Sequence, residues 1–153
     1  MNSIIFTPAE KRAITRAKNI LAEKIGGYNI KLESPMRVRD FLTLSLGAEE
    51  REHFEVIFLT SQNAVIAKER LFSGTINAAS VYPREVVKRA LELNAANVIF
   101  AHNHPSGELE PSQSDKLITK RLQDALGCVD INVLDHLIVS GVSFCSFAER
   151  GLL

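Results

Sequence analysis

Two histidines and an aspartate lie close together in the stretch AHNHPSGELEPSQSDK, residues 101–116. His102 and His104 are two positions apart, so at the end of a strand both imidazoles point to one face. A turn follows, and a helix that opens at Ser112 would place Asp115 in its first turn, facing back toward the histidines. Two histidines and a carboxylate supply three ligands of a catalytic zinc site and leave a fourth tetrahedral position for water. The spacing therefore predicts that His102, His104 and Asp115 bind Zn²⁺.

Each part of this pattern also has a simpler interpretation. Ser112-x-x-Asp115 is a common helix cap, in which the serine accepts a backbone N–H and the helix dipole favours the aspartate. His-x-His pairs occur by chance, and a histidine is often a hydrogen-bonded core residue. The combination of a buried strand, the His-x-His pair, a turn and an aspartate in the next helix favours the metal site over these separate explanations.

A hydrolase built on such a site also needs a general base, and glutamate is a common choice. The base can come from a distant strand, so spacing alone does not choose among Glu49, Glu50, Glu52, Glu55, Glu69, Glu108 and Glu110. On residue type alone, each of them is an ordinary surface charge.

The elements that must position this cluster begin with two N-terminal helices. Residues 8–26 are predicted to be helical, because Thr7 can cap the helix and a Gly-Gly pair ends it. Ser34-Pro35 repeats the start signal for a second helix, which is expected to end near Gly47.

Strands and helices alternate over the rest of the chain. The runs FEVIFL (residues 54–59) and AVIAKERLF (residues 64–72) are rich in β-branched and aromatic residues and predict a hairpin. The run NVIFA is nearly all apolar, which is typical of a strand covered on both faces. Further strands and helices are predicted as follows: helices over 83–94 and 112–126, and strands over 97–101, 131–134 and 136–139. This alternation favours a single-domain α/β sandwich.

The composition narrows the function classes. The 153 residues are 46% apolar, enough for one hydrophobic core, and 18 basic side chains balance 18 acidic ones. Binding to a nucleic-acid backbone is therefore not indicated by charge. The sequence has no signal-peptide pattern and no membrane-spanning run, and Cys128 and Cys145 form neither a disulfide framework nor a thiolate zinc motif. We expect a cytoplasmic protein with free thiols and no membrane association.

The pattern H-x-H, seven residues, S-x-x-D resembles the JAMM motif of MPN-type zinc metalloproteases, and His102, His104, Ser112 and Asp115 match all four of its positions. The strings LFSGTINAASVYPREV, AHNHPSGELEPSQSD and DHLIVS resemble the RadC-like branch of that superfamily. This resemblance runs from about residue 40 to the C-terminus.

The resemblance implies a fold and a domain organisation. A JAB/MPN-like domain, with a mixed and curved β-sheet sandwiched between helices, is expected over residues 31–153, and an N-terminal helical extension over residues 1–30. Longer RadC-like proteins carry an N-terminal module with helix-hairpin-helix character that suits DNA contact. The resemblance therefore also associates the chain with DNA repair, although only one or two helices precede its sheet.

The resemblance further assigns roles to the site residues. In the JAMM family the two histidines and the aspartate bind zinc, and the serine helps to stabilise the oxyanion, which is the role implied for Ser112. The family's general base is a glutamate just before an early hydrophobic strand. In EREHFEVIFL this position is occupied by Glu52, and its nearest competitors are Glu50 and Glu55.

The activity implied is that of a zinc-dependent metallopeptidase or isopeptidase, which cleaves an amide bond of a peptide or protein conjugate. The alternative is a non-catalytic module that keeps the fold and the metal site for interaction with protein or DNA. All five site residues are intact, which argues against decay of the site. The residue types identify neither a substrate nor an oligomeric state.

Three other enzyme classes fit less well. The letters HNH at residues 102–104 lack the dispersed ββα pattern and the basic cluster of the nuclease of that name. A nucleobase deaminase needs a Pro-Cys-x-x-Cys segment, which the sequence lacks. In a hydrolase triad of Ser106, Asp135 and His136, the last two side chains would point to opposite strand faces. We expect His136 to be a structural residue near the metal site and His53 to be a strand residue without a chemical role.

Overall fold

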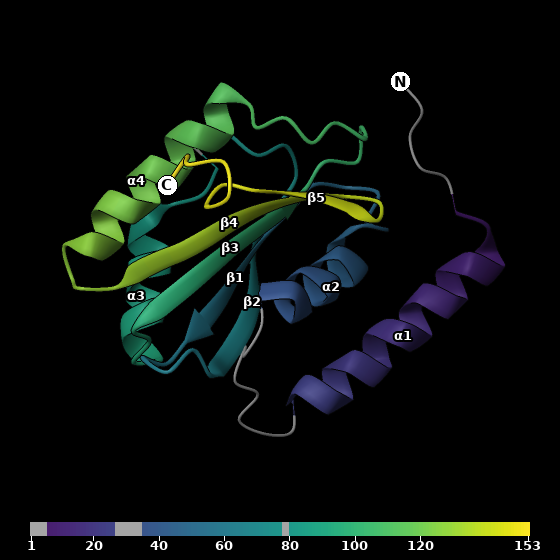
Figure 1. Ribbon diagram of the computed structural model, residues 1–153, viewed down its shortest axis with the longest axis horizontal. Helices are drawn as coiled ribbons and strands as arrows, with labels where there is room; N and C mark the ends of the chain where they lie inside the picture. The colour runs from purple at the N-terminus through teal and green to yellow at the C-terminus, as the bar shows by residue number, and fades with distance from the viewer. Residues whose placement is uncertain (1–5, 27–34, 78–79) are drawn as a thin grey trace.

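The computed structural model describes residues 6–26, 35–77 and 80–153 (Figure 1). Four helices lie in these residues: α1 (Pro8–Gly26), α2 (Pro35–Leu46), α3 (Pro83–Glu92) and α4 (Gln113–Gly127). The strands are β1 (His53–Leu59), β2 (Val65–Ser73), β3 (Asn97–Asn103), β4 (Asn132–Ser140) and β5 (Ser143–Ser146). The predicted hairpin, the helices and the α/β class are confirmed.

The five strands form one mixed sheet in the order β2-β1-β3-β4-β5. β1 pairs antiparallel with β2 and with β3, β3 pairs parallel with β4, and β4 pairs antiparallel with β5. β3 is the central strand, and all of its residues are buried. The sequence predicts β3 over residues 97–101, whereas the strand continues to Asn103 and so includes His102.

The C-terminal strands differ from the prediction. The prediction of two short strands over residues 131–134 and 136–139 is wrong, because the single strand β4 runs through both segments, from Asn132 to Ser140. β5 is absent from the sequence-based prediction. It follows a two-residue turn whose first residue, Gly141, has a φ of 58°. A glycine at that position is typical of tight hairpin turns.

A β-bulge explains why β4 resembles two strands in the sequence. Val98 of β3 pairs with Val133, but the next residue, Ile99, pairs with Asp135. Leu134 is therefore an extra residue with no partner on β3, and the alternation of inward and outward side chains shifts at this point.

Helices cover both faces of the sheet, as the resemblance implies (Figure 1). α3 and α4 pack on one face, whose buried residues include Phe54, Phe58, Val86, Phe100, Ile118 and Leu122. α2 packs on the other face, whose buried residues include Val38, Leu42, Ile57, Ile99 and Leu137. Because side chains alternate along a strand, His102 lies on the same face as Phe100, toward α4.

The N-terminal helix begins with the predicted cap. Thr7 N donates to Glu10 Oε2 at 2.7 Å, and Glu10 N donates to Thr7 Oγ1 at 3.3 Å. α1 lies beside α2 and is linked to the loop before β1 by an ion pair between Lys18 and Glu49 at 2.9 Å (Figure 1). No helix within the described ranges has both the length and the hydropathy needed to cross a bilayer. The expected domain boundary between residues 30 and 31 and the predicted cap at Ser34 lie outside the described residues.

Candidate metal centre

His102 lies on the central strand with its side chain fully buried. It pairs with Phe54 across the β1–β3 ladder, and the two rings are stacked with centroids 6.3 Å apart. Nδ1 of His102 lies 2.8 Å from Nε2 of His136, which belongs to β4. Contacts from both neighbouring strands thus hold the imidazole with its Nε2 toward α4.

His104 follows the last residue of β3, and β4 anchors its backbone. The His104 N–H donates to Val139 O at 2.9 Å, and its carbonyl accepts from Ser140 Oγ at 2.9 Å. Nδ1 of His104 lies 2.8 Å from the carbonyl oxygen of Glu108. A carbonyl only accepts, so Nδ1 carries the hydrogen and Nε2 of the neutral ring has a free lone pair.

Asp115 is the third residue of α4, and it is both part of the helix cap and a member of the cluster. Ser112 N donates to Asp115 Oδ2 at 2.7 Å, and Asp115 N donates to Ser112 Oγ at 3.0 Å. This capping box fixes the carboxylate in the first turn, with Asp115 only 2% exposed. The capping and the metal-ligand interpretations of Ser-x-x-Asp are therefore compatible.

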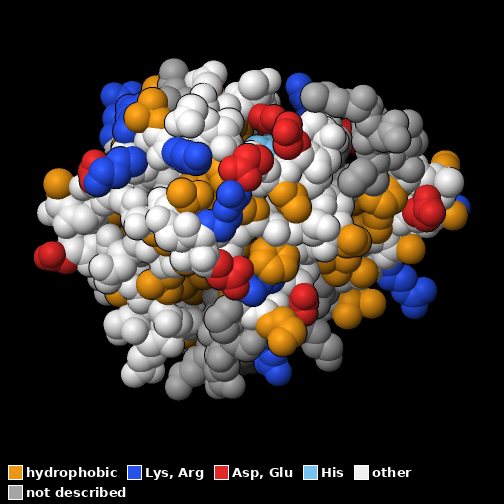
Figure 2. All heavy atoms as spheres, turned by 45° about the horizontal axis from the view of Figure 1, so that its top comes forward, with side chains coloured by type: hydrophobic (Ala, Val, Ile, Leu, Met, Phe, Trp, Pro, Cys, Tyr) orange, Lys and Arg blue, Asp and Glu red, His pale blue; other side chains and the backbone are white. Residues whose placement is uncertain are grey.

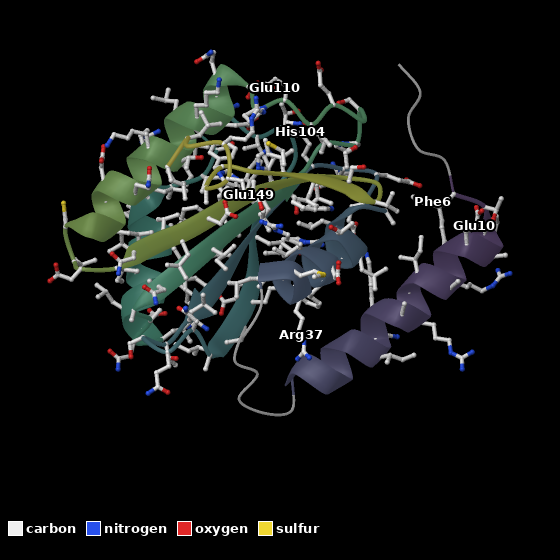
Figure 3. All side chains as sticks on the ribbon, in the orientation of Figure 1. Phe6, Glu10, Arg37, His104, Glu110 and Glu149 are labelled. Atoms are coloured by element: carbon white, nitrogen blue, oxygen red, sulfur yellow. The ribbon has the colours of Figure 1, made fainter. Side chains whose placement is uncertain are left out.

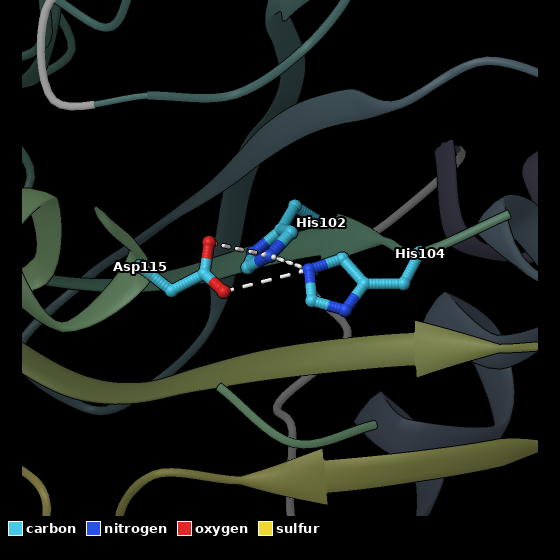
Figure 4. A group of neighbouring side chains, drawn as sticks. All are labelled: His102, His104 and Asp115. Atoms are coloured by element: carbon cyan, nitrogen blue, oxygen red, sulfur yellow. Dashed lines mark hydrogen bonds and ion pairs between the residues drawn. The ribbon is translucent and has the colours of Figure 1, made fainter. Parts of the chain in front are cut away.

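The three side chains converge on one point (Figure 4). Nε2 of His102 lies 2.9 Å from Nε2 of His104, and the Asp115 oxygens lie 3.2 Å and 3.5 Å from these two nitrogens. Donors bound to a tetrahedral zinc at about 2.0–2.1 Å stand about 3.3 Å from one another. The donor set and its spacing therefore fit a metal ion of this size, and the structure brings the three predicted ligands together.

Of the three side chains of the centre, that of His104 is the most exposed to solvent. His102 is fully buried, whereas the side chain of His104 is 14% exposed. His104 is the only one of the four histidines that is not buried. A histidine is visible in a hollow flanked by acidic side chains (Figure 2), and His104 lies at the same end of the molecule as Glu110 (Figure 3).

The cluster favours the charged forms of Asp115 and His104 and the neutral form of His102. Burial alone would raise the pKa of Asp115, but its interactions with His102 and His104 and its hydrogen bond with Ser112 hold that pKa well below its usual range. Burial lowers the pKa of His102 and outweighs the attraction of Asp115. At His104 burial also acts to lower the pKa, but the hydrogen bonds to Asp115 and to the Glu108 carbonyl raise it overall. In the metal-free protein, His104 is therefore the site that takes a proton.

The structure separates the candidate bases. The carboxylate of Glu52 acts on the pKa of both His102 and His104, and its Oε2 accepts a hydrogen bond from Ile76 N at 2.7 Å. Glu55 is buried in ion pairs with two basic residues of β2, at 2.8 Å and 3.0 Å, and Glu50 is exposed and paired with α1. Of Glu50, Glu52 and Glu55, Glu52 is the one whose charge acts on the pKa of both His102 and His104.

Two residues behind the cluster had weaker signals in the sequence. His136 was expected to lie near the site, and its Nε2 contacts His102 directly. For Thr119 the only indication in the sequence is its position, one helical turn after Asp115. Its Oγ1 lies 2.6 Å from His136 Nδ1 and donates to the Asp115 carbonyl at 2.6 Å.

The serine-hydrolase alternative is excluded by geometry. His136 Nδ1 faces Thr119, while Asp135 accepts hydrogen bonds from the His136 backbone N–H and from Ser146 Oγ. Asp135 therefore does not orient the imidazole. Cys128 and Cys145 are both free thiols, as expected.

Comparisons with known proteins agree with this architecture. The family model of the RadC-like JAB domain matches residues 32–152. The UPF0758 protein YkfG of Escherichia coli K12 is 54% identical over 148 residues, which cover 97% of this chain and 94% of YkfG. The UPF0758 protein YeeS of the same organism is 52% identical and is covered over its whole length.

A longer relative shows the same similarity over part of its length. A UPF0758 protein of Pseudoalteromonas translucida is 65% identical over 120 residues, which cover 78% of this chain and 54% of that protein. The chain thus spans about half the length of some curated relatives and nearly all of others. None of these names states an activity. The match over about four fifths of the chain, together with the mixed sheet and the His-His-Asp cluster, shows that the chain belongs to the RadC-like JAB domain family.

Proposed function

We propose that this protein is a zinc-dependent metallohydrolase that cleaves an amide or isopeptide bond in a peptide or protein conjugate. The observation that carries the proposal is the spacing of the His102, His104 and Asp115 donor atoms, which lie between 2.9 and 3.5 Å apart. Zinc bound by three protein ligands keeps one position open, lowers the pKa of water toward neutrality and polarises a carbonyl group.

Glu52 is the proposed general base. It accepts a proton from the attacking water and delivers a proton to the leaving amine as the C–N bond breaks and the new C–O bond forms. The backbone hydrogen bond from Ile76 holds the carboxylate in place. A glutamine at this position keeps an oxygen for that hydrogen bond but cannot take up the proton.

Ser112 is the proposed donor to the substrate's carbonyl oxygen as negative charge develops there. Its Oγ accepts from Asp115 N, and the hydroxyl still has its own hydrogen to donate. Removing a donor positioned in this way typically lowers kcat by about 10²–10³-fold.

The test uses zinc-loaded protein and a pool of internally quenched peptides with either backbone amide or lysine isopeptide linkages. We expect turnover by the wild type, its loss with a zinc chelator and its recovery on adding zinc. Glu52→Gln should keep its zinc and lose about 10²–10⁴ in kcat, because only the proton transfer is removed. The matched control Glu50→Gln should retain wild-type rates. Zinc-loaded wild type that cleaves neither linkage would contradict the proposal and favour a non-catalytic binding module.

A further inference from the structure

A hydrogen-bonded chain of buried side chains runs behind the candidate metal centre and joins two of its ligands. It leads from His102 on β3 to His136 on β4, then to Thr119 on α4 and back to the Asp115 backbone. His102 and His136 are fully buried, and Thr119 is 1% exposed. These groups are shielded from water, so their hydrogens are placed by partners within the protein.

The direction of each hydrogen bond follows from the carbonyl at the end of the chain. Thr119 Oγ1 lies 2.6 Å from the Asp115 carbonyl oxygen, which only accepts, so the single hydroxyl hydrogen of Thr119 points there. The same Oγ1 lies 2.6 Å from His136 Nδ1 and must accept from it. His136 therefore carries its hydrogen on Nδ1, and its Nε2 has a lone pair.

The second imidazole then has only one arrangement available. The Nε2 lone pair of His136 accepts from His102 Nδ1 at 2.8 Å, so His102 also carries its hydrogen on Nδ1. Nε2 of neutral His102 is left without a hydrogen, facing Nε2 of His104 and the Asp115 carboxylate. This is the form of imidazole that binds a metal through Nε2.

We propose that Thr119 and His136 are positioning residues that hold His102 as the Nδ1–H tautomer, so that its Nε2 is ready to bind the metal. The inference rests on the metal centre of the proposed function but not on hydrolysis. Partners of this kind typically change metal affinity by about 10–100-fold when they are removed.

Thr119 offers the sharper test, because it is two hydrogen bonds away from the metal-facing nitrogen. Thr119→Val keeps the shape of the side chain but removes the acceptor of the His136 Nδ1–H. Without that acceptor, His136 is more stable with its hydrogen on Nε2. This N–H would face the Nδ1–H of His102, so the hydrogen of His102 must move to its metal-facing Nε2. Thr119→Ser keeps the hydroxyl and is the matched control.

The experiment records long-range ¹H–¹⁵N spectra of the histidine rings in metal-free protein at about pH 8, and measures zinc affinity by competition with a chelator. We expect the wild type and Thr119→Ser to show His102 as the Nδ1–H tautomer. We expect Thr119→Val to show the Nε2–H tautomer and to bind zinc about 10–100-fold more weakly. An unchanged His102 tautomer in Thr119→Val, or a zinc affinity within about threefold of that of Thr119→Ser, overturns the inference. The tautomer is read without zinc or substrate, so a protein that binds zinc but cleaves nothing would contradict the proposed hydrolysis and leave this inference standing.

Discussion

Ser112 and Asp115 each hold the other's backbone N–H, at 2.7 Å and 3.0 Å, and the same Asp115 carboxylate faces the two histidines. The helix cap at the start of α4 and the candidate metal centre therefore share the Asp115 side chain. A ligand carboxylate tied to a helix cap loses little side-chain freedom when a metal binds, which favours binding.

Asp115→Asn separates the two roles of this side chain. The amide oxygen still accepts from Ser112 N, so the helix cap is kept, and we expect the metal-free protein to lose mainly the stabilisation that the carboxylate gives to protonated His104. Zinc affinity should fall by more than about 100-fold, because an anionic ligand is lost rather than a supporting hydrogen bond. Urea unfolding and chelator competition measure the two effects. Wild-type zinc affinity in Asp115→Asn would remove Asp115 from the ligand set.

Ser112→Gly distinguishes the cap from the proposed oxyanion donor. Glycine is tolerated at a helix N-cap at a cost of only a few tenths of a kcal/mol, so the melting temperature should change little. The variant lacks the hydroxyl, and kcat on a cleavable peptide should fall by about 10²–10³. If kcat stays at the wild-type value in this variant, Ser112 is a cap only.

His104 makes the stability of the metal-free protein depend on pH. Its pKa in the folded state is raised above the ordinary 6.5, so the protonated ring stabilises the fold fully below pH 6.5, and this contribution is lost as pH rises through the raised pKa. Asp115 stays ionised throughout this range, because its own pKa is lowered.

The corresponding measurement compares wild type with His104→Gln by urea unfolding at several pH values, in the presence of a chelator. The stability difference between the two proteins should be largest at or below pH 6.5 and should shrink as the pH is raised. A difference that grows with pH would mean that the neutral form of His104 is the stabilising one.

Gly47 is the point where α2 contacts the turn between β4 and β5. A Cβ at Gly47 would lie 1.9 Å from the Gly141 carbonyl oxygen and 2.5 Å from that of Thr43. We expect Gly47→Ala to destabilise the protein by about 1–3 kcal/mol, because the helix must move away from the turn. Gly127→Ala, at the end of α4 with no atom within 4 Å of its Cβ, is the control and should be neutral or stabilising by up to about 1 kcal/mol. Equal effects of both substitutions on the unfolding midpoint would show that the contact is not tight.

The parts of the fold that the sequence predicted are those whose signal is local. The Thr7 cap, the apolar run of β3 and the Ser112 cap each depend on residues a few positions apart, and each is found in the structure. The His102, His104 and Asp115 cluster was predictable for the same reason, because a strand end, a turn and a first helical turn fix its geometry within one short segment.

The parts that were missed depend on contacts between distant segments. Leu134 bulges out of β4 because the strand must match β3, and no residue type in VLD marks that shift. β5 has four residues and exists only by pairing with β4, although Gly141 could have indicated the turn. Thr119 is an ordinary helix residue until His136 packs against it from another strand.

The measurement that tests the metal centre most directly is the zinc content of the full chain, purified without a chelator or a nickel resin, beside folded His102→Ala and His104→Ala variants. We expect about one zinc per wild-type chain and almost none in either variant, since each variant loses one of three protein ligands. Wild-type protein that holds no zinc even after reconstitution, or variants that keep the full amount, would contradict it.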